Sequence, residues 1–183
     1  MSKLILGLTG PIASGKGTIK KYLVEKYKAD DCRFSSILRD VLTRTAVPIS
    51  RENLQKVSTA LRQTFGEDTL AKAIAADAST LKADIVVVDG VRRLADIKYL
   101  SQIPGFILVK VDADPKIRHN RVITRNENAG DAEKTFDHFL KDHESEADRD
   151  VPIVMAQANE TIENTGSLDD LFAQVDVIVK KYQ

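Results

Sequence analysis

The sequence has one cysteine, Cys32, no tryptophan and no excess of either charge. A single cysteine excludes an internal disulfide and any cysteine-rich zinc site. Lys plus Arg and Asp plus Glu both number 27, so the formal net charge is zero, whereas a protein that mainly grips nucleic acid usually has a basic excess. With six Phe and four Tyr, the chain is also poor in the aromatic side chains on which single-stranded bases stack. We therefore expect no nucleic-acid partner.

Long apolar runs are missing as well. No stretch approaches the roughly 18 consecutive apolar residues of a membrane span. The apolar start of the chain is interrupted by Gly7 and Gly10 and leads into a lysine-rich segment instead of a small-residue cleavage site. We expect a cytoplasmic protein with no membrane partner.

Short apolar runs alternate with longer amphipathic segments along the 183 residues. The runs at 3–9, 84–90 and 105–113 predict buried strands, and those at 160–164 and 32–35 are weaker. Helical spacing follows at 16–28, at 50–65 behind a Ser50 cap, and at the C-terminus behind a Ser167 cap. This alternation predicts an α/β protein with a parallel sheet and helices on both faces. Residues 36–80 read as all-helical and residues 126–150 are highly polar, so both are expected as insertions over the carboxyl edge of the sheet, where ligands bind.

A glycine-rich loop separates the first predicted strand from the first predicted helix. Gly10, Gly15 and Lys16 fit the G-x-x-x-x-G-K pattern of a phosphate-binding loop, in which backbone N–H groups and a helix N-terminus surround phosphates. Gly17 stands where Ser or Thr would hold magnesium, and Thr18 comes one place later. An ordinary strand–turn–helix corner is the competing interpretation. We predict that ATP is bound by Gly10, Pro11, Ile12, Ala13, Ser14, Gly15, Lys16, Gly17 and Thr18.

The segment "GPIASGKGT" resembles the phosphate loop of adenylate kinase and other nucleoside monophosphate kinases, in which glycine at this place is normal and magnesium is held largely through waters. The resemblance implies a three-layer α/β/α P-loop kinase fold with a five-stranded parallel sheet of order 2-3-1-4-5. It also implies a single domain over residues 1–183, with an acceptor-binding insert at about 36–80 and a short lid at about 126–150.

An aspartate and two arginines follow the second buried run. Asp89 ends that run, and an acidic residue at a strand end beside a phosphate loop can orient magnesium or its waters. Arginines just beyond it can bind an acceptor phosphate through two parallel hydrogen bonds. The segment resembles the "DGxPR" of adenylate kinases, which gives Arg93 that role. It also resembles the "DGxR" of an archaeal branch described as adenylate-kinase-like or dephospho-CoA-kinase-related, which gives it to Arg92. The sequence does not decide between Arg92 and Arg93. The competing interpretation is that both are solvated arginines at the start of a helix.

Three arginines, Arg118, Arg121 and Arg125, share one face of the predicted helix after the third strand. The resemblance implies that Arg121 and Arg125 hold ATP and spread developing charge, one on the adenine and one on the phosphates. Arg118 has no counterpart. A solvated basic stripe is the competing interpretation.

The resemblance places further contacts in the two insertions. Arg39 corresponds to the arginine of the monophosphate-binding helix, and Arg62 lies in an "LRxxxG" element of the archaeal branch. Lys141 and Arg149 are candidates in the lid. The loop at Asn164, Gly166 and Ser167 resembles the one that surrounds adenine, although a plain Gly-Ser helix start would explain it equally.

Together these residues predict magnesium-dependent transfer of the γ-phosphate of ATP to a small phosphorylated acceptor, most closely a nucleoside monophosphate, by a monomer or homodimer. Lys16 would stabilise the transferring group and Asp89 would hold Mg²⁺ through water, with Thr18 as a second candidate ligand. The first rival is dephospho-CoA kinase, whose hydroxyl acceptor needs a catalytic aspartate that Asp30 or Asp31 could supply. The other is an ATP-binding switch module without turnover.

Overall fold

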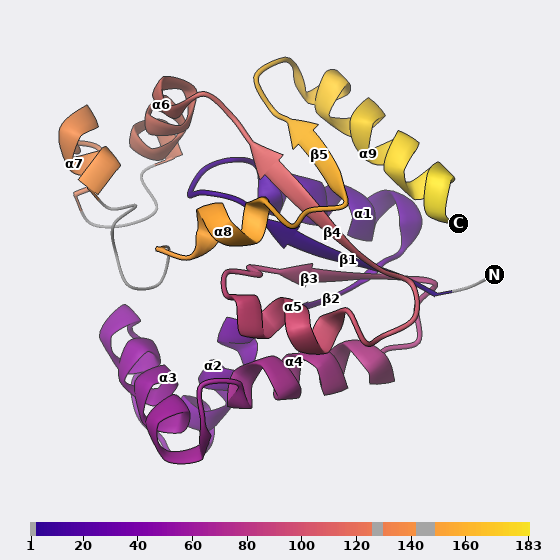
Figure 1. The fold of residues 1–183 in the computed structure, drawn as a ribbon. Coiled ribbons are helices and arrows are strands. Elements are labelled where there is room, and N and C mark those ends of the chain that lie inside the picture. The colour runs from indigo at the N-terminus through magenta and orange to yellow at the C-terminus, as the bar shows by residue number, and fades with distance from the viewer. Residues whose placement is uncertain (1–2, 126–129, 142–148) are drawn as a thin grey trace.

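The structure is a computed structural model that describes residues 3–125, 130–141 and 149–183. Its centre is a parallel sheet in which the strands follow the order β2-β3-β1-β4-β5 (Figure 1). This confirms the predicted fold class and strand order. The strands are β1 (Leu4–Thr9), β2 (Asp30–Arg33), β3 (Ile85–Asp89), β4 (Phe106–Asp112) and β5 (Glu160–Glu163).

Helices cover both faces of the sheet (Figure 1). One face carries α1 (Lys16–Tyr27) and α9 (Leu168–Tyr182), and the other carries α4 (Thr69–Thr80), α5 (Leu94–Leu100) and α8 (Val151–Met155). Four further helices lie toward the carboxyl edge: α2 (Phe34–Arg44), α3 (Arg51–Phe65), α6 (Pro115–Arg125) and α7 (Phe136–Lys141). Within the described part of the chain, no helix is long and apolar enough to cross a membrane.

The central strands are apolar on both sides because both sides are covered. In β1, Leu4, Leu6 and Leu8 pack against α1 and α9, whereas Ile5 packs against the α4–α5 side. Val86 and Val88 of β3 join the second cluster in the same alternation. A strand buried on both faces reads as a continuous apolar run, which explains why these strands were predictable from the sequence.

A polar network fastens α9 to α1 at the outer edge of the first layer. Asp176 of α9 accepts hydrogen bonds from the hydroxyls of Tyr22 and Tyr27 at 2.8 and 2.7 Å and from Nζ of Lys26 at 2.7 Å. The ring of Tyr22 also stacks on Phe172 with centroids 4.0 Å apart. The network holds the helix that follows the phosphate loop against the C-terminal helix.

Residues 36–80 are helical as predicted, with α2, α3 and α4, although α4 covers the sheet instead of lying over its carboxyl edge. Ser50 caps α3 as expected, because its side chain accepts a hydrogen bond from the backbone N–H of Asn53. Of the 15 residues of α3, none is buried. This helix therefore stands away from the core as a separate wall (Figure 1).

Two predicted segments differ from the structure or extend beyond it. The weak strand expected at 32–35 lies at Asp30–Arg33, and α2 begins at Phe34. The strand stops there because Arg33 pairs with Asp89, the last residue of β3, so no partner remains for a longer strand. Of the predicted lid at 126–150, residues 126–129 and 142–148 lie outside the described residues, and the described part contains α7.

Candidate active site

The loop between β1 and α1 requires glycine at two positions. Gly10 has φ 144° and Gly15 has φ 110°, both in the region that L side chains rarely adopt. A Cβ on Gly10 would lie 2.0 Å from the carbonyl oxygen of Val111, and one on Gly15 would lie 2.1 Å from Nδ2 of Asn164. The loop is thus pressed against the ends of neighbouring strands, which fixes its path.

The same loop presents donors suited to the phosphates of a nucleotide. Helix α1 begins at Lys16, and its N-cap, Gly15, provides no side-chain hydrogen bond to the first turn. A helix N-terminus without a side-chain cap is suited to binding an anion. Nζ of Lys16 donates to the carbonyl oxygens of Gly10 and Pro11 at 2.6 and 2.8 Å. Among the described residues, Oγ of Ser14 is buried without a hydrogen-bond partner. A buried hydroxyl, a lysine and a helix N-terminus around one glycine-rich turn fit a nucleotide's phosphates.

Asn164 connects this loop to α6. Its Nδ2 donates to the carbonyl oxygen of Ser14 at 2.8 Å, while Nη2 of Arg121 donates to the Asn164 carbonyl at 2.9 Å and to Oδ1 at 3.2 Å. Arg121 also donates to the carbonyl of Ala13 at 3.4 Å. The structure therefore brings two of the predicted ATP-binding residues, Arg121 and Asn164, directly to the phosphate loop.

Arg118 reaches the loop from the same helix. Its Nε donates to the carbonyl of Ala113 at 3.0 Å and its Nη1 to the carbonyl of Ile12 at 3.4 Å. The guanidinium carbon lies 5.3 Å from the ring centroid of Phe139, which belongs to α7. Burial lowers the pKa of Arg118 and also that of Arg121. Arg118, for which the sequence suggested no role, thus links the phosphate loop to the described part of the lid.

Asp89 stands beside the loop at the end of β3. It pairs in register with Leu8 of β1, and its Oδ2 lies 3.6 Å from Nζ of Lys20, which is one helical turn after Lys16. The same Lys20 ammonium lies 3.4 Å from Oδ2 of Asp31. No group of three or more His, Cys, Asp or Glu suited to a metal occurs among the described residues. This donor set fits Mg²⁺ held by one carboxylate, waters and substrate phosphates, which is its usual arrangement in such sites.

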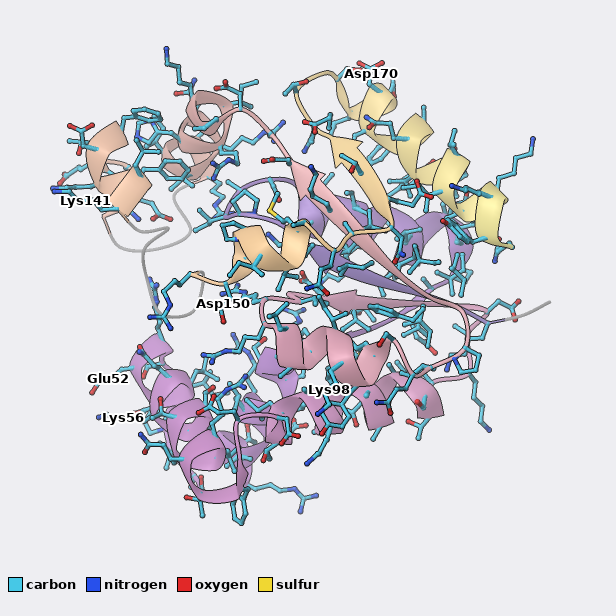
Figure 2. All side chains as sticks on the ribbon, in the orientation of Figure 1. Glu52, Lys56, Lys98, Lys141, Asp150 and Asp170 are labelled. Atoms are coloured by element: carbon cyan, nitrogen blue, oxygen red, sulfur yellow. The ribbon has the colours of Figure 1, made fainter. Side chains whose placement is uncertain are left out.

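A cavity of about 630 Å³ opens at the end of β3, with Asp89 in its wall. One side is a single face of α3, and the other comes from the ends of β2 and β3 and the starts of α2 and α5. The opposite face of α3 carries the ion pair of Glu52 and Lys56, 2.5 Å apart, which points away from the molecule in Figure 2. The lining includes five arginines: Arg33, Arg51, Arg62, Arg92 and Arg93.

Buried Asp96 organises the turn that presents two of these arginines. Its Oδ2 accepts hydrogen bonds from the backbone N–H groups of Arg92 and Arg93, each at 3.0 Å. Burial raises the pKa of Asp96, against the lowering effect of these two hydrogen bonds. Glu67 joins the cluster, since its Oε2 lies 3.5 Å from Nη1 of Arg93 and its carbonyl accepts from Arg62 at 2.6 Å. Three of the four predicted acceptor residues, Arg62, Arg92 and Arg93, therefore meet in one cavity.

The structure does not bring the fourth, Arg39, to this cavity. Leu38 and Leu42 are the buried residues of α2, and Arg39 is exposed. Thr18 and Gly17 are also exposed, and a Cβ on Gly17 would meet nothing within 4 Å.

The remaining predicted residues lie at the margins of the site. Arg125 is exposed at the end of α6, and Lys141 is exposed at the end of α7, on the outside of the molecule in Figure 2. Arg149 has its Nε 3.9 Å from Oδ1 of the adjacent Asp150. The Ser167 side chain caps α9 in a reciprocal arrangement with Asp170, and a Cβ on Gly166 would lie 2.7 Å from Oδ2 of that aspartate.

Sequence reasoning missed Arg33, Arg51, Lys20 and Asp96. Arg33 lies at the end of a strand and Arg51 at the start of a helix behind Ser50, so the sequence predicts the element boundary at which each residue lies. Neither signal indicates that the two residues line one cavity, because that depends on where the folded chain places α3 relative to the end of β2. Asp96 could have been found as an acidic residue three places after Arg93, the position that completes a capping box.

A phosphate-binding loop on a parallel sheet of order 2-3-1-4-5, with an arginine-lined cavity at the carboxyl edge, defines a P-loop kinase-like protein. The AAA_17 family model, described as an AAA domain, matches residues 9–150, and the chain belongs to this family. It is also 30% identical over 181 residues to a UPF0200 protein from Thermococcus kodakarensis, with 96% of each chain covered, so it is a member of the UPF0200 family as well.

Solved structures of small-molecule kinases share the fold. A shikimate kinase from Bacteroides thetaiotaomicron is 14% identical with a TM-score of 0.62, and the match covers 97% of each chain. A gluconokinase from Sinorhizobium meliloti is 10% identical with a TM-score of 0.55, covering 98% of this chain and 93% of the other. At such low identity these likenesses show the fold alone.

Proposed function

We propose that this protein transfers the γ-phosphate of ATP to a small phosphate-bearing acceptor, and that the acceptor is a nucleoside monophosphate. The observation that carries this proposal is the cavity of about 630 Å³, whose wall contains five arginines and Asp89. Asp89 pairs in register with Leu8 of β1, the strand that leads into the phosphate loop. Cavities of roughly 300–1,000 Å³ accommodate small ligands. A second phosphate held there would lie next to the terminal phosphate of ATP.

On the ATP side, the residues supply position and positive charge, which are the main requirements of phosphoryl transfer. The amides at the start of α1 would bind the phosphates, and the Lys16 ammonium would exchange its two carbonyl partners for phosphate oxygens. Arg121 and Arg125 would hold ATP and spread the developing charge. Asp89 would hold Mg²⁺ through water, with Thr18 as the second candidate ligand, and the ion would neutralise phosphate charge. The Asn164–Ser167 segment would border the adenine.

On the acceptor side, Arg92 and Arg93 would orient the receiving phosphate, with Arg62 beside them in the cavity wall. A phosphate oxygen is already anionic near neutral pH, so this reaction needs no general base. The backbone hydrogen bonds from both arginines to Asp96 keep their turn in place. Arg39, the remaining acceptor residue suggested by the resemblance, is exposed and outside the cavity lining, so it would contact the acceptor from the periphery of the site.

Dephospho-CoA kinase is the second candidate. Its hydroxyl acceptor would need a base, and the favouring observation is a carboxylate, Asp89, in the cavity wall. Asp31 shares Lys20 with Asp89 and could assist. Asp30 is less suited, because its Oδ2 accepts a hydrogen bond at 3.1 Å from the backbone N–H of Ala83, which precedes β3 at the opposite edge of the sheet.

One experiment separates these proposals. ADP production is measured with ATP, Mg²⁺ and, in turn, each nucleoside monophosphate and dephospho-CoA. The protein is compared with Lys16→Ala and with Lys21→Ala, a matched control that removes an exposed lysine of α1 whose ion-pair partner among the described residues is Glu25. We expect a monophosphate to accelerate ADP production, Lys16→Ala to reduce it by about 100-fold or more, and Lys21→Ala to leave it unchanged. Acceleration by dephospho-CoA alone would favour the second candidate, and ATP binding without any acceptor effect would favour a switch module.

A further inference from the structure

The cavity beside the phosphate loop contains more positive charge than one acceptor phosphate uses. Five arginines line it together with three carboxylates, those of Glu67, Asp89 and Asp96. Like charges enclosed together repel one another, and the repulsion grows as water is excluded. A negatively charged ligand relieves this repulsion. The positions of the arginines therefore indicate where the anionic groups of a ligand would bind.

The three carboxylates of the cavity each have other partners. Glu67 lies beside Arg93, Asp96 accepts from the backbone of Arg92 and Arg93, and Asp89 pairs with Lys20 from α1. All three therefore stabilise the turn after β3 or the edge of the phosphate loop. Among the described residues, none of the three forms an ion pair or side-chain hydrogen bond with Arg33 or Arg51.

Arg33 and Arg51 line the cavity from its two walls, Arg33 from the end of β2 and Arg51 from the start of α3. Within residues 3–125, 130–141 and 149–183, neither guanidinium has an ion-pair or hydrogen-bond partner. Both side chains are exposed yet belong to the cavity wall. As residues of the cavity wall, they are positioned to meet a ligand.

The two sets of arginines also lie at different distances from the phosphate loop. Arg33 is the last residue of the edge strand β2, and β3 separates it from β1. Adjacent strands are about 4.8 Å apart, so the backbone of Arg33 is about 10 Å from that of β1. Arg51 opens α3, the wall that stands away from the sheet (Figure 1). Arg92 and Arg93 follow β3, the direct neighbour of β1, and are the nearer set.

Neutral side chains occupy the wall around both sets. Phe34, Leu38 and Leu54 provide apolar surface, and Gln55, Ser58 and Thr59 provide uncharged polar groups. Such a surface suits the uncharged body of a small molecule, a ring or a sugar, between two charged ends.

We propose that the acceptor carries two separate anionic groups: a phosphate that faces Arg92 and Arg93 and receives the phosphoryl group, and a second phosphate or carboxylate that faces Arg33 and Arg51. The inference rests on the proposed function and narrows its acceptor to doubly anionic small molecules. It makes Arg33 and Arg51 determinants of specificity.

The test compares ligands that differ by one phosphate. AMP, adenosine 2′,5′-bisphosphate and adenosine 3′,5′-bisphosphate are titrated calorimetrically into the protein with the phosphate loop saturated by Mg²⁺ and a non-hydrolysable ATP analogue. We expect at least one bisphosphate to bind about tenfold tighter than AMP, since charge-assisted hydrogen bonds to guanidinium groups are among the strong ones. Arg33→Gln and Arg51→Gln should each remove most of that preference and change AMP binding by less than about threefold.

Lys56→Gln is the matched control, because it removes one positive charge from the outer face of α3. It should leave the preference intact. Equal binding of AMP and both bisphosphates would overturn the inference. So would an equal loss of AMP and bisphosphate binding in Arg33→Gln and Arg51→Gln, which would indicate general attraction instead of a second anion site.

Turnover with the same ligands distinguishes this inference from the proposed function. A bisphosphate preference that depends on Arg33 and Arg51, without ADP production from any acceptor, would refute phosphoryl transfer and keep the doubly anionic ligand. Rapid turnover of AMP with no bisphosphate preference would refute the second anion site and keep the kinase.

Discussion

Replacing Gly15 by alanine should destabilise the protein for two separable reasons. Gly15 has φ 110°, a conformation that costs a residue with a side chain about 1–3 kcal/mol. The new Cβ would also lie 2.1 Å from Nδ2 of Asn164, and overpacking of this kind costs about 1–3 kcal/mol. We expect the free energy of unfolding to fall by about 2–6 kcal/mol in total.

The two contributions can be separated through Asn164. Asn164→Ala removes the hydrogen bond to the Ser14 carbonyl and the one that Oδ1 accepts from Arg121. A buried group that loses its partner costs about 1–3 kcal/mol, so we expect a loss of about 2–4 kcal/mol. In the double variant the alanine methyl no longer meets the amide, and only the backbone strain of Gly15→Ala remains. The double variant should therefore lose about 1–3 kcal/mol less than the sum of the two single losses.

Urea unfolding followed by far-UV circular dichroism measures all four free energies. Gly17→Ala is the matched control in the same loop, because a Cβ there meets nothing within 4 Å. It should be neutral or stabilise the protein by up to about 1 kcal/mol, since alanine favours helix more than glycine. Strictly additive losses, or a Gly17→Ala variant as unstable as Gly15→Ala, would refute the close approach of Asn164 as the cause.

Three further predictions concern pH and magnesium. Burial raises the pKa of Asp96 above 3.8. Its contribution to stability is therefore full below pH 3.8 and is lost as the pH rises through the pKa of the folded state. Asp96→Asn should remove this decrease of the unfolding free energy with rising pH, measured between about pH 4 and about pH 7. Burial also acts to raise the pKa of Asp176, but hydrogen bonds from Lys26 and two tyrosines outweigh it and hold that pKa below 3.8. Its contribution is therefore present above 3.8 and lost in acid, so the stability difference between the protein and Asp176→Asn should shrink as the pH falls; a constant difference would contradict the network. Gly17→Ser should leave the unfolding free energy within about 0.5 kcal/mol and lower the magnesium concentration needed for half-maximal ADP production, because the hydroxyl stands where strict phosphate loops hold the ion.

The fold and the phosphate loop were predictable because their signals are local. The apolar strands are short continuous runs, and the loop is defined by glycines and a lysine at fixed spacing, so neighbours in sequence carry the information. The strand order came from the resemblance and is confirmed. The caps at Ser50 and Ser167 are confirmed for the same local reason.

The acceptor side was less predictable because it depends on rotation and distant contacts. Arg39 is one residue after buried Leu38, and one residue on a helix is a rotation of about 100°, so packing Leu38 inward turns Arg39 outward. Arg33 and Arg51 line one cavity only because the fold places the end of β2 and the start of α3 in its wall. Asn164 joins Ser14, 150 residues away, a contact that no spacing in the sequence expresses.

The absence of buried residues in α3 has a consequence for how such a protein diversifies. A wall without buried residues can exchange side chains that line the cavity, such as Gln55, Ser58 and Thr59, without changing the buried core of the sheet. Substitutions at these few positions would change which small molecule the protein accepts, while the stability of the core would stay the same.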